Sequence, residues 1–414
     1  MKLLRARRLF LKLTLILVGL LFGIAIAEIA LRVAGYSFPL FYTPDASRGY
    51  ALLPGSEGEF RLEGSHSYVR INSQGLHDIE HTFAKPENTI RIAIIGDSYA
   101  EAMHAGLDHA FWAVLQAKLK ECNAFGGKNV EVINFGVSGY GTAQELITLR
   151  EQAWKYSPDI VILAVTTSND VTDNSRLLKQ TGDIPYFVFQ NNRLTLDDSF
   201  KNSKSIIGSN STLNRFGRWL RVHLRVVQAA IEAHRGLKAT IASWRSRRSA
   251  PEPPANPAPD TSRPDLLSRS QELGLDNLIY REPGDETWKD AWKVTEQLIV
   301  AARDEVISHH ARFVVVTLSN GPQVLPGREA RQYFMQRFGV RDLFYPDNRI
   351  KALGARENFE VITLAPELQA FAEQNQTFLH GFGANIGNGH WNATGHRVAG
   401  ELIAKKMCEG GLFK

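Results

Sequence analysis

The sequence predicts an α/β protein whose core is a parallel sheet of five strands flanked by helices. From Thr89 onward, short apolar segments alternate with segments of helical length and spacing. Strands separated by helices pair in parallel through right-handed crossovers, so this alternation predicts a parallel sheet. The 414 residues are 44% hydrophobic and 22% charged, an ordinary composition for a protein with a large buried core.

Residues 1–35 are predicted to form a cytoplasmic basic tip and a transmembrane anchor. An uncharged segment, Leu13–Ala27, follows five basic residues, and with its flanks Leu9–Leu31 is long enough to cross a bilayer. The alternative is a cleaved signal peptide, because Ala25-Ile26-Ala27 resembles a cleavage site. The anchor is favoured because apolar helical patterning continues to Val33. Either way, the basic end stays cytoplasmic and the body is exported.

The net charge of +5 gives little reason to expect a nucleic-acid partner. Much of it lies in the N-terminal cluster of Lys2, Arg5, Arg7, Arg8 and Lys12, and the rest of the chain is nearly balanced. A basic isoelectric point that comes from one terminal cluster describes that cluster and not a binding surface.

The body divides into a β-rich lead-in, residues 36–89, and a domain at residues 90–408. The predicted strands of the domain are Ile90–Ile95, Val130–Asn134, Ile160–Val165, Phe313–Leu318 and Val361–Leu364. The predicted helices are Ala110–Lys120, Ala143–Tyr156, Glu286–His309, Arg328–Phe338 and Thr394–Cys408, the last one after a long loop. The chain has no phosphate-binding glycine fingerprint.

An insertion at 176–285 interrupts the domain. Apolar residues recur at helical spacing from Leu213 to Trp244, and arginines from Arg215 to Arg248 decorate the same helix. Such a helix lies on an anionic membrane surface, covers a cleft, or packs on the domain with a solvated arginine face. The last interpretation is favoured. Five prolines between 251 and 259 then predict a stiff linker.

The two cysteines, Cys122 and Cys408, fall near the ends of predicted helices. An oxidising compartment would allow them to pair, and the alternative is two buried thiols.

The segment Ile90–Ser98 carries the first candidate for catalysis. An apolar strand runs through Gly96 and Asp97 into Ser98, which would project from the carboxyl end of the strand, where open α/β sheets bind ligands. Ser98 is therefore a candidate nucleophile. The alternative is an ordinary helix N-cap turn.

Three further candidates follow other predicted strands or precede the last helix. Gly139 lies in a glycine-rich turn, Asn169 follows the third strand, and His390 precedes the last helix. Singly, each is equally well explained as a turn, a cap or a structural loop residue. Together they supply what acyl transfer needs: a nucleophile, a base, and donors for the oxyanion from the N–H groups of Ser98 and Gly139 and the Asn169 side chain.

These residues resemble the SGNH (GDSL) hydrolase family, including its membrane-anchored bacterial members. Its landmarks occur in order as Gly-Asp-Ser at 96–98, Val-Ser-Gly at 137–139, Ser-Asn-Asp at 168–170 and His-Trp-Asn at 390–392. The resemblance covers residues 89–175 and 311–408. It implies a three-layer, flavodoxin-like α/β/α sandwich, ester chemistry without metal or cofactor, and the roles given above. It also implies a single-pass protein of the bacterial inner membrane with a periplasmic catalytic domain.

The chain departs from the family pattern in two places. Tyr99 stands where the family name has leucine, and Gly387 stands where the family has an aspartate three residues before the histidine. The group that orients His390 is then Asn388, a backbone carbonyl, or a carboxylate from elsewhere in the chain. His396 is expected to be structural.

Three functions fit these features. The first is a serine esterase acting on acyl esters, with acetyl as a candidate, of a cell-envelope polysaccharide or lipid. The second is an O-acyltransferase that uses the same acyl-enzyme. The third is a catalytically weak member that binds glycan or scaffolds an envelope complex, and its main support is the missing aspartate.

Overall fold

In the computed structural model, which describes residues 2–249 and 278–409, the five predicted strands form one parallel sheet. In chain order they are β5 (Thr89–Gly96), β6 (Asn129–Asn134), β7 (Ile160–Thr166), β10 (Arg312–Leu318) and β11 (Glu360–Thr363). Their order across the sheet is β11-β10-β7-β5-β6, with every pairing parallel. By position along the chain this is the order 2-1-3-4-5, which is that of flavodoxin-like sheets. The predicted fold class is confirmed.

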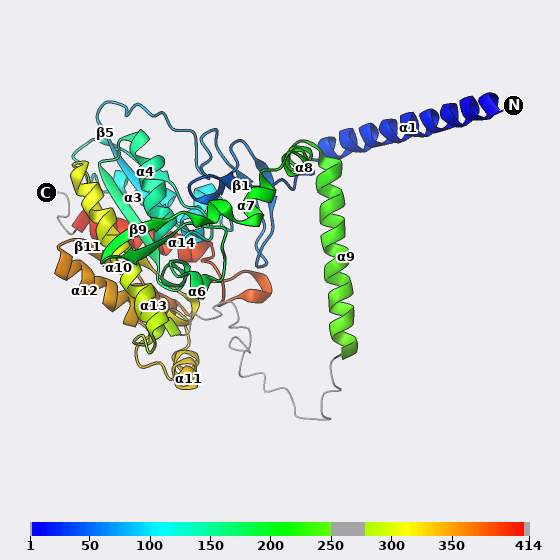
Figure 1. The fold of residues 1–414 in the computed structure, drawn as a ribbon. Helices are drawn as coiled ribbons and strands as arrows, with labels where there is room; N and C mark the ends of the chain where they lie inside the picture. The colour runs from blue at the N-terminus through cyan, green and yellow to red at the C-terminus, as the bar shows by residue number, and fades with distance from the viewer. Residues whose placement is uncertain (1, 250–277, 410–414) are drawn as a thin grey trace.

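Helices cover both faces of the sheet (Figure 1). On one face α3 (Phe111–Glu121), α13 (Ala365–Asn375) and α14 (Ala393–Glu409) pack on alternate strand residues such as Ile92 and Ile94. On the other face α4 (Thr142–Glu151), α10 (Glu286–Ser308) and α12 (Tyr345–Glu357) pack on their neighbours, such as Ala93 and Ile95. Because both faces are buried, the strands are continuous apolar runs, which is why the sequence identifies them so well.

Several elements differ from the prediction. Helices α12 and α13 were not predicted, and α13 occupies part of the predicted long loop. A helix signal is present there, since Pro366 stands at the start of α13 and Glu367 in its first turn. The predicted helix Ala143–Tyr156 ends at Glu151 and continues as a 3₁₀ turn, Ala153–Tyr156. Helix α11 (Arg328–Phe338) has the predicted bounds.

The lead-in consists of two antiparallel hairpins that dock on the carboxyl edge of the sheet. The first pairs β1 (Tyr42–Asp45) with β2 (Gly49–Leu52), and the second pairs β3 (Glu57–Phe60) with β4 (Ser67–Arg70). Their apolar side chains form a separate small core with residues of the loops that follow β5 and β6. The cluster comprises Phe41, Leu52, Phe60, Val69, Ile71, Met103, Val137 and Tyr140. The lead-in is therefore packed against the part of the domain that holds the candidate site.

The N-terminal helix α1 (Lys2–Val33) projects away from the body (Figure 1). Its segment Phe10–Val33 is long and apolar enough to cross a membrane, and none of it is buried against the protein. This agrees with the predicted anchor by length and composition.

The insertion contains a hairpin of β8 (Tyr186–Gln190) and β9 (Arg193–Asp197), short helices α6 (Arg176–Lys179) and α7 (Lys204–Ser209), and two longer helices. The prediction of a single amphipathic helix is wrong. The helical segment is broken at Leu224, whose backbone is extended, into α8 (Thr212–His223) and α9 (Arg225–Ser249). The predicted proline-rich linker at 251–259 lies outside the described residues.

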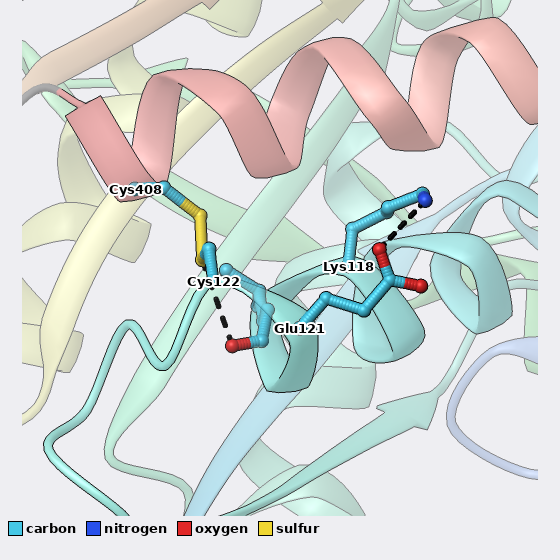
Figure 2. Close-up of a disulfide and its surroundings, with 5 residues drawn as sticks. Lys118, Glu121, Cys122 and Cys408 are labelled. Atoms are coloured by element: carbon cyan, nitrogen blue, oxygen red, sulfur yellow. Dashed lines mark hydrogen bonds and ion pairs between the residues drawn. A yellow bond between two sulfur atoms is a disulfide. The ribbon is translucent and has the colours of Figure 1, made fainter.

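Cys122 and Cys408 form a disulfide between the carboxyl ends of α3 and α14 (Figure 2). The bond joins residues 286 positions apart in the sequence. It therefore closes a loop that includes four of the five strands of the sheet, β6, β7, β10 and β11. Such closure stabilises a fold mainly by restricting the unfolded chain.

Replacing both cysteines by serine is expected to lower the free energy of unfolding by about 2–4 kcal/mol. Urea unfolding followed by circular dichroism measures this. A reductant should destabilise the wild type and leave the double variant unchanged. An equal response of both proteins to the reductant would contradict the assignment.

Candidate active site

Ser98 lies where β5 turns into the short helix α2 (Ser98–Glu101). Asp97 caps this helix, its side chain accepting a hydrogen bond from the Tyr99 N–H at 3.0 Å. Gly96 suits this close approach, because a Cβ there would lie only 3.1 Å from the carbonyl oxygen of Ala164 on the neighbouring strand. The tight turn thus places the serine hydroxyl at the carboxyl edge of the sheet, beside the switch point between β5 and β7.

His390 reaches Ser98 from the loop before α14. Its Nε2 lies 2.7 Å from the Ser98 Oγ, so the two residues that the sequence pairs are in contact. The loop turns through Gly387 and Gly389, both with positive φ, a conformation that suits glycine. The His390 carbonyl accepts a hydrogen bond from the Gly381 N–H at 2.9 Å, which fixes the backbone on the opposite side.

Glu63, in the turn between β3 and β4, holds the other side of the histidine ring. Its two carboxylate oxygens lie 3.0 and 2.9 Å from Nδ1 of His390, and one of them also accepts the His390 backbone N–H at 3.1 Å. Burial acts to raise the pKa of Glu63, but the bonds to His390 and its charge outweigh burial and lower the pKa to about 2. The carboxylate is therefore ionised and accepts only, so Nδ1 carries the proton and Nε2 accepts from Ser98.

Sequence reasoning left the group on Nδ1 open between Asn388, a backbone carbonyl and an unidentified carboxylate. The geometry matches the third alternative, and the carboxylate comes from the lead-in rather than from the residues around Gly387. No local motif marks Glu63, which is 327 positions from its partner. The one local sign is conformational: Glu63 has a φ of 54°, which is unusual for glutamate.

His104 stacks on His390, with ring centroids 4.2 Å apart and planes inclined by 14°. Burial and the charge of His390 lower the pKa of His104 to about 3, so its ring is neutral. It forms a wall of the site and keeps water from one face of His390. His396 is buried, and its Nδ1 accepts the backbone N–H of Phe111 at 3.3 Å, in line with the expected structural role.

Within the described ranges, Glu63, His104 and His390 form a group with metal-site spacing, one ligand atom of each lying within 4.8 Å of the others. In this arrangement His390 uses both ring nitrogens for Ser98 and Glu63. The contacts therefore match proton transfer between side chains.

Asn169 begins helix α5 (Asn169–Asp173) after β7 and is bonded to the turn that carries Ser98. Its Nδ2 donates to Asp97 Oδ2 at 2.8 Å. A side-chain amide has two N–H groups, and this bond uses one of them. The bond to Asp97 thus orients the amide next to the nucleophile.

Gly139 lies in the turn after β6, with a φ of 76°. The preceding residue, Ser138, is held on both sides: its N–H donates to Glu101 Oε1 at 3.0 Å, and its carbonyl accepts from the Tyr50 hydroxyl at 2.8 Å. Tyr42 donates in turn to Glu101 at 2.9 Å. Two tyrosines of the lead-in therefore fix the turn that carries the predicted oxyanion donor.

Buried carboxyl groups lie behind this edge of the sheet. Glu101 is fully buried, and burial raises its pKa to about 7. Burial and neighbouring carboxyl groups also raise the pKa of Glu145 and Asp170 well above the ordinary range. Both carboxyl oxygens of Glu145 lack a hydrogen-bond partner within the described part of the chain. An unpaired buried carboxylate is costly, so this environment favours the protonated form of Glu145.

No family model matches the chain, and no curated protein matches it. Among solved structures the chain is similar to the acetyl xylan esterase AlAXEase, at 13% identity over 76% of this chain and 98% of that one, with a TM-score of 0.36. A lipase/acylhydrolase from Enterococcus faecalis shares 12% identity over 77% and 95%, with a TM-score of 0.34. A putative lipolytic protein of the G-D-S-L family from Desulfitobacterium hafniense DCB-2 shares 10% identity over 76% and 98%, with a TM-score of 0.33.

Replacing Glu63 by glutamine should abolish most Ser98-dependent turnover while leaving the fold intact. In the Ser-His-Asp triad of serine proteases, loss of the carboxylate lowers kcat by about 10⁴-fold. Without it the histidine is no longer held in the correct tautomer, and the imidazolium that forms has no counter-charge. Steady-state hydrolysis of an aryl acetate measures this. Asn388→Ala serves as the comparison and should stay close to wild type. The assignment of Glu63 is wrong if the Asn388 variant loses turnover and the Glu63 variant keeps it.

Replacing Glu145 by glutamine should stabilise the protein at pH 8 and flatten its stability profile. A raised pKa means that the folded state holds the proton more tightly than the unfolded state. The Glu145 contribution therefore falls as pH rises above the ordinary carboxyl range, by up to about 1.4 kcal/mol per pH unit. Urea unfolding between pH 4 and pH 8 measures the slope, with exposed Glu151→Gln at the end of the same helix as control. Identical slopes in wild type and Glu145→Gln would refute the prediction.

Proposed function

We propose that the protein is a carboxylic ester hydrolase that works through an acyl-enzyme on Ser98. The observation that carries the proposal is the hydrogen-bonded series from the Ser98 hydroxyl through His390 to the Glu63 carboxylate. A serine hydroxyl is a weak nucleophile until a base takes its proton, and a base needs a group that holds its tautomer. All three groups are present with hydrogen-bonding distances.

In the proposed reaction the Ser98 oxygen attacks the carbonyl carbon of the ester while His390 Nε2 takes the hydroxyl proton. Glu63 stabilises the imidazolium that forms. The tetrahedral oxyanion accepts hydrogen bonds from the N–H groups of Ser98 and Gly139 and from the Asn169 side chain. His390 then returns the proton to the leaving alcohol. Water then attacks the acyl-enzyme while His390 takes one of its protons. His390 returns that proton to the Ser98 oxygen as the bond to the acyl group breaks and the acid leaves.

The proposed substrates are acyl esters, with acetyl as a candidate, of a polysaccharide or lipid of the bacterial cell envelope. Two features support this setting. The segment Phe10–Val33 of α1 has the length and composition of a membrane span and follows a basic N-terminus, which supports a body on the extracytoplasmic side. The disulfide between Cys122 and Cys408 suits an oxidising compartment such as the periplasm.

The hypothesis of a catalytically weak scaffold loses its main support. It depended on the aspartate that is missing at Gly387, and Glu63 occupies the place at Nδ1 that this aspartate would have. Transfer of the acyl group to a sugar hydroxyl uses the same acyl-enzyme and is left as an outcome of the test.

The test uses the full-length protein in nanodiscs, treated with a fluorophosphonate probe and assayed on p-nitrophenyl acetate. We expect labelling and turnover that disappear in Ser98→Ala and persist in Ser308→Ala, an exposed serine at the end of α10. Absence of labelling and of Ser98-dependent turnover in folded protein would overturn the proposal. Turnover that rises with added acceptor sugar, with acylated sugar as product, would replace hydrolysis by transfer.

A further inference from the structure

Helix α8 presents its apolar side to the outside of the molecule. Leu213, Phe216 and Trp219 recur every three residues, and the exposed fractions of these residues are 79%, 55% and 51%. Residues at this spacing lie along one side of a helix, so the three side chains form a continuous stripe. Soluble surfaces rarely carry adjacent large apolar side chains that no protein group covers.

The basic side of α8 faces the body instead. Arg218 and Arg221 are half-buried and line a cleft between α7, α8 and Leu40. Arg218 also donates a hydrogen bond to the Ser209 carbonyl at 2.5 Å. This reverses the favoured expectation of a helix packed through apolar residues with a solvated arginine face. Two of the three arginines of α8 are thus partly covered by the body, whereas the stripe of Leu213, Phe216 and Trp219 is exposed.

The position of α8 next to the candidate membrane span indicates what covers this stripe. Arg32, in the last turn of α1, donates to the carbonyl of His223 at the end of α8, at 2.6 Å. Glu28 of α1 accepts the N–H of Val226, in the first turn of α9, at 2.9 Å. The carboxyl end of the candidate membrane span is therefore bonded to the α8–α9 junction. In Figure 1 α8 lies beside the foot of α1, and α9 runs across the direction of α1.

We propose that α8 lies in the headgroup region of the membrane that α1 crosses, with Leu213, Phe216 and Trp219 in the acyl boundary. A bilayer that surrounds α1 must end close to Arg32, at the level of the α8–α9 junction. Amphipathic helices with aromatic and leucine side chains on the apolar side and arginine on the other bind this interface. This contact, together with α1, would hold the catalytic domain in one orientation to the membrane.

The proposal is tested on full-length protein in nanodiscs that contain anionic lipid. Because both native cysteines are in the disulfide, single cysteines can be introduced at Phe216 or Trp219 and labelled with the fluorophore NBD. Arg215→Cys is the matched control, since it is adjacent in sequence to Phe216 and about 100° away around the helix. Ser308→Cys, on the body, is a second control.

We expect labels at 216 and 219 to emit at shorter wavelength and to lose most of their fluorescence with doxyl-labelled lipid. Labels at 215 and 308 should respond to aqueous iodide and much less to the lipid quencher. Equal quenching by iodide at 215 and 216 would overturn the proposal. Protection at 216 that depends on protein density and not on doxyl lipid would also overturn it, because a second copy of the chain would then cover the stripe.

Discussion

The arrangement of the candidate site depends on the contact between Glu63 and His390. Two carboxylate oxygens hold Nδ1 and the backbone N–H of one histidine, so this contact sets the tautomer and the direction in which Nε2 faces Ser98. Glu63 holds a left-handed backbone conformation, which costs an L-residue about 1–3 kcal/mol. The charge-assisted bonds to His390 offset such a cost. The carboxylate of Glu63, whose backbone is strained, thereby occupies the place of the aspartate that is missing at Gly387.

The lead-in is consequently part of the candidate site and more than a connector. One hairpin supplies Glu63, and the other supplies Tyr42 and Tyr50, which fix Glu101 and Ser138 and hence the turn that carries Gly139. Its own small apolar core attaches both hairpins to the loops after β5 and β6. The hydroxyl, ring and amide groups around Ser98 are thus positioned by the sheet and by the lead-in that packs on it.

The same lead-in is continuous with the N-terminal helix. Ser37, shortly after α1, accepts the backbone N–H of Glu59 in β3 at 2.8 Å, and the Phe38 N–H donates to Gln228 of α9 at 2.9 Å. Strand β3 leads directly into the turn of Glu63. A short series of backbone contacts therefore connects the candidate membrane span with the group that orients His390. The site and the anchor are adjacent parts of one structure.

The amino-acid sequence by itself determined the sheet, its parallel class and the pairing of Ser98 with His390. The sheet follows from apolar runs that are buried on both faces. The pairing of Ser98 with His390 follows from the groups that acyl transfer needs and from the motifs that resemble a known family. Tertiary structure alone decided the role of Glu63, the break at Leu224 and the outward direction of the α8 stripe. The physical reason is that an ion pair 327 residues apart, or a helix turned by its neighbours, depends on how finished elements dock. Periodicity describes which side of a helix is apolar, and only packing decides what that side meets.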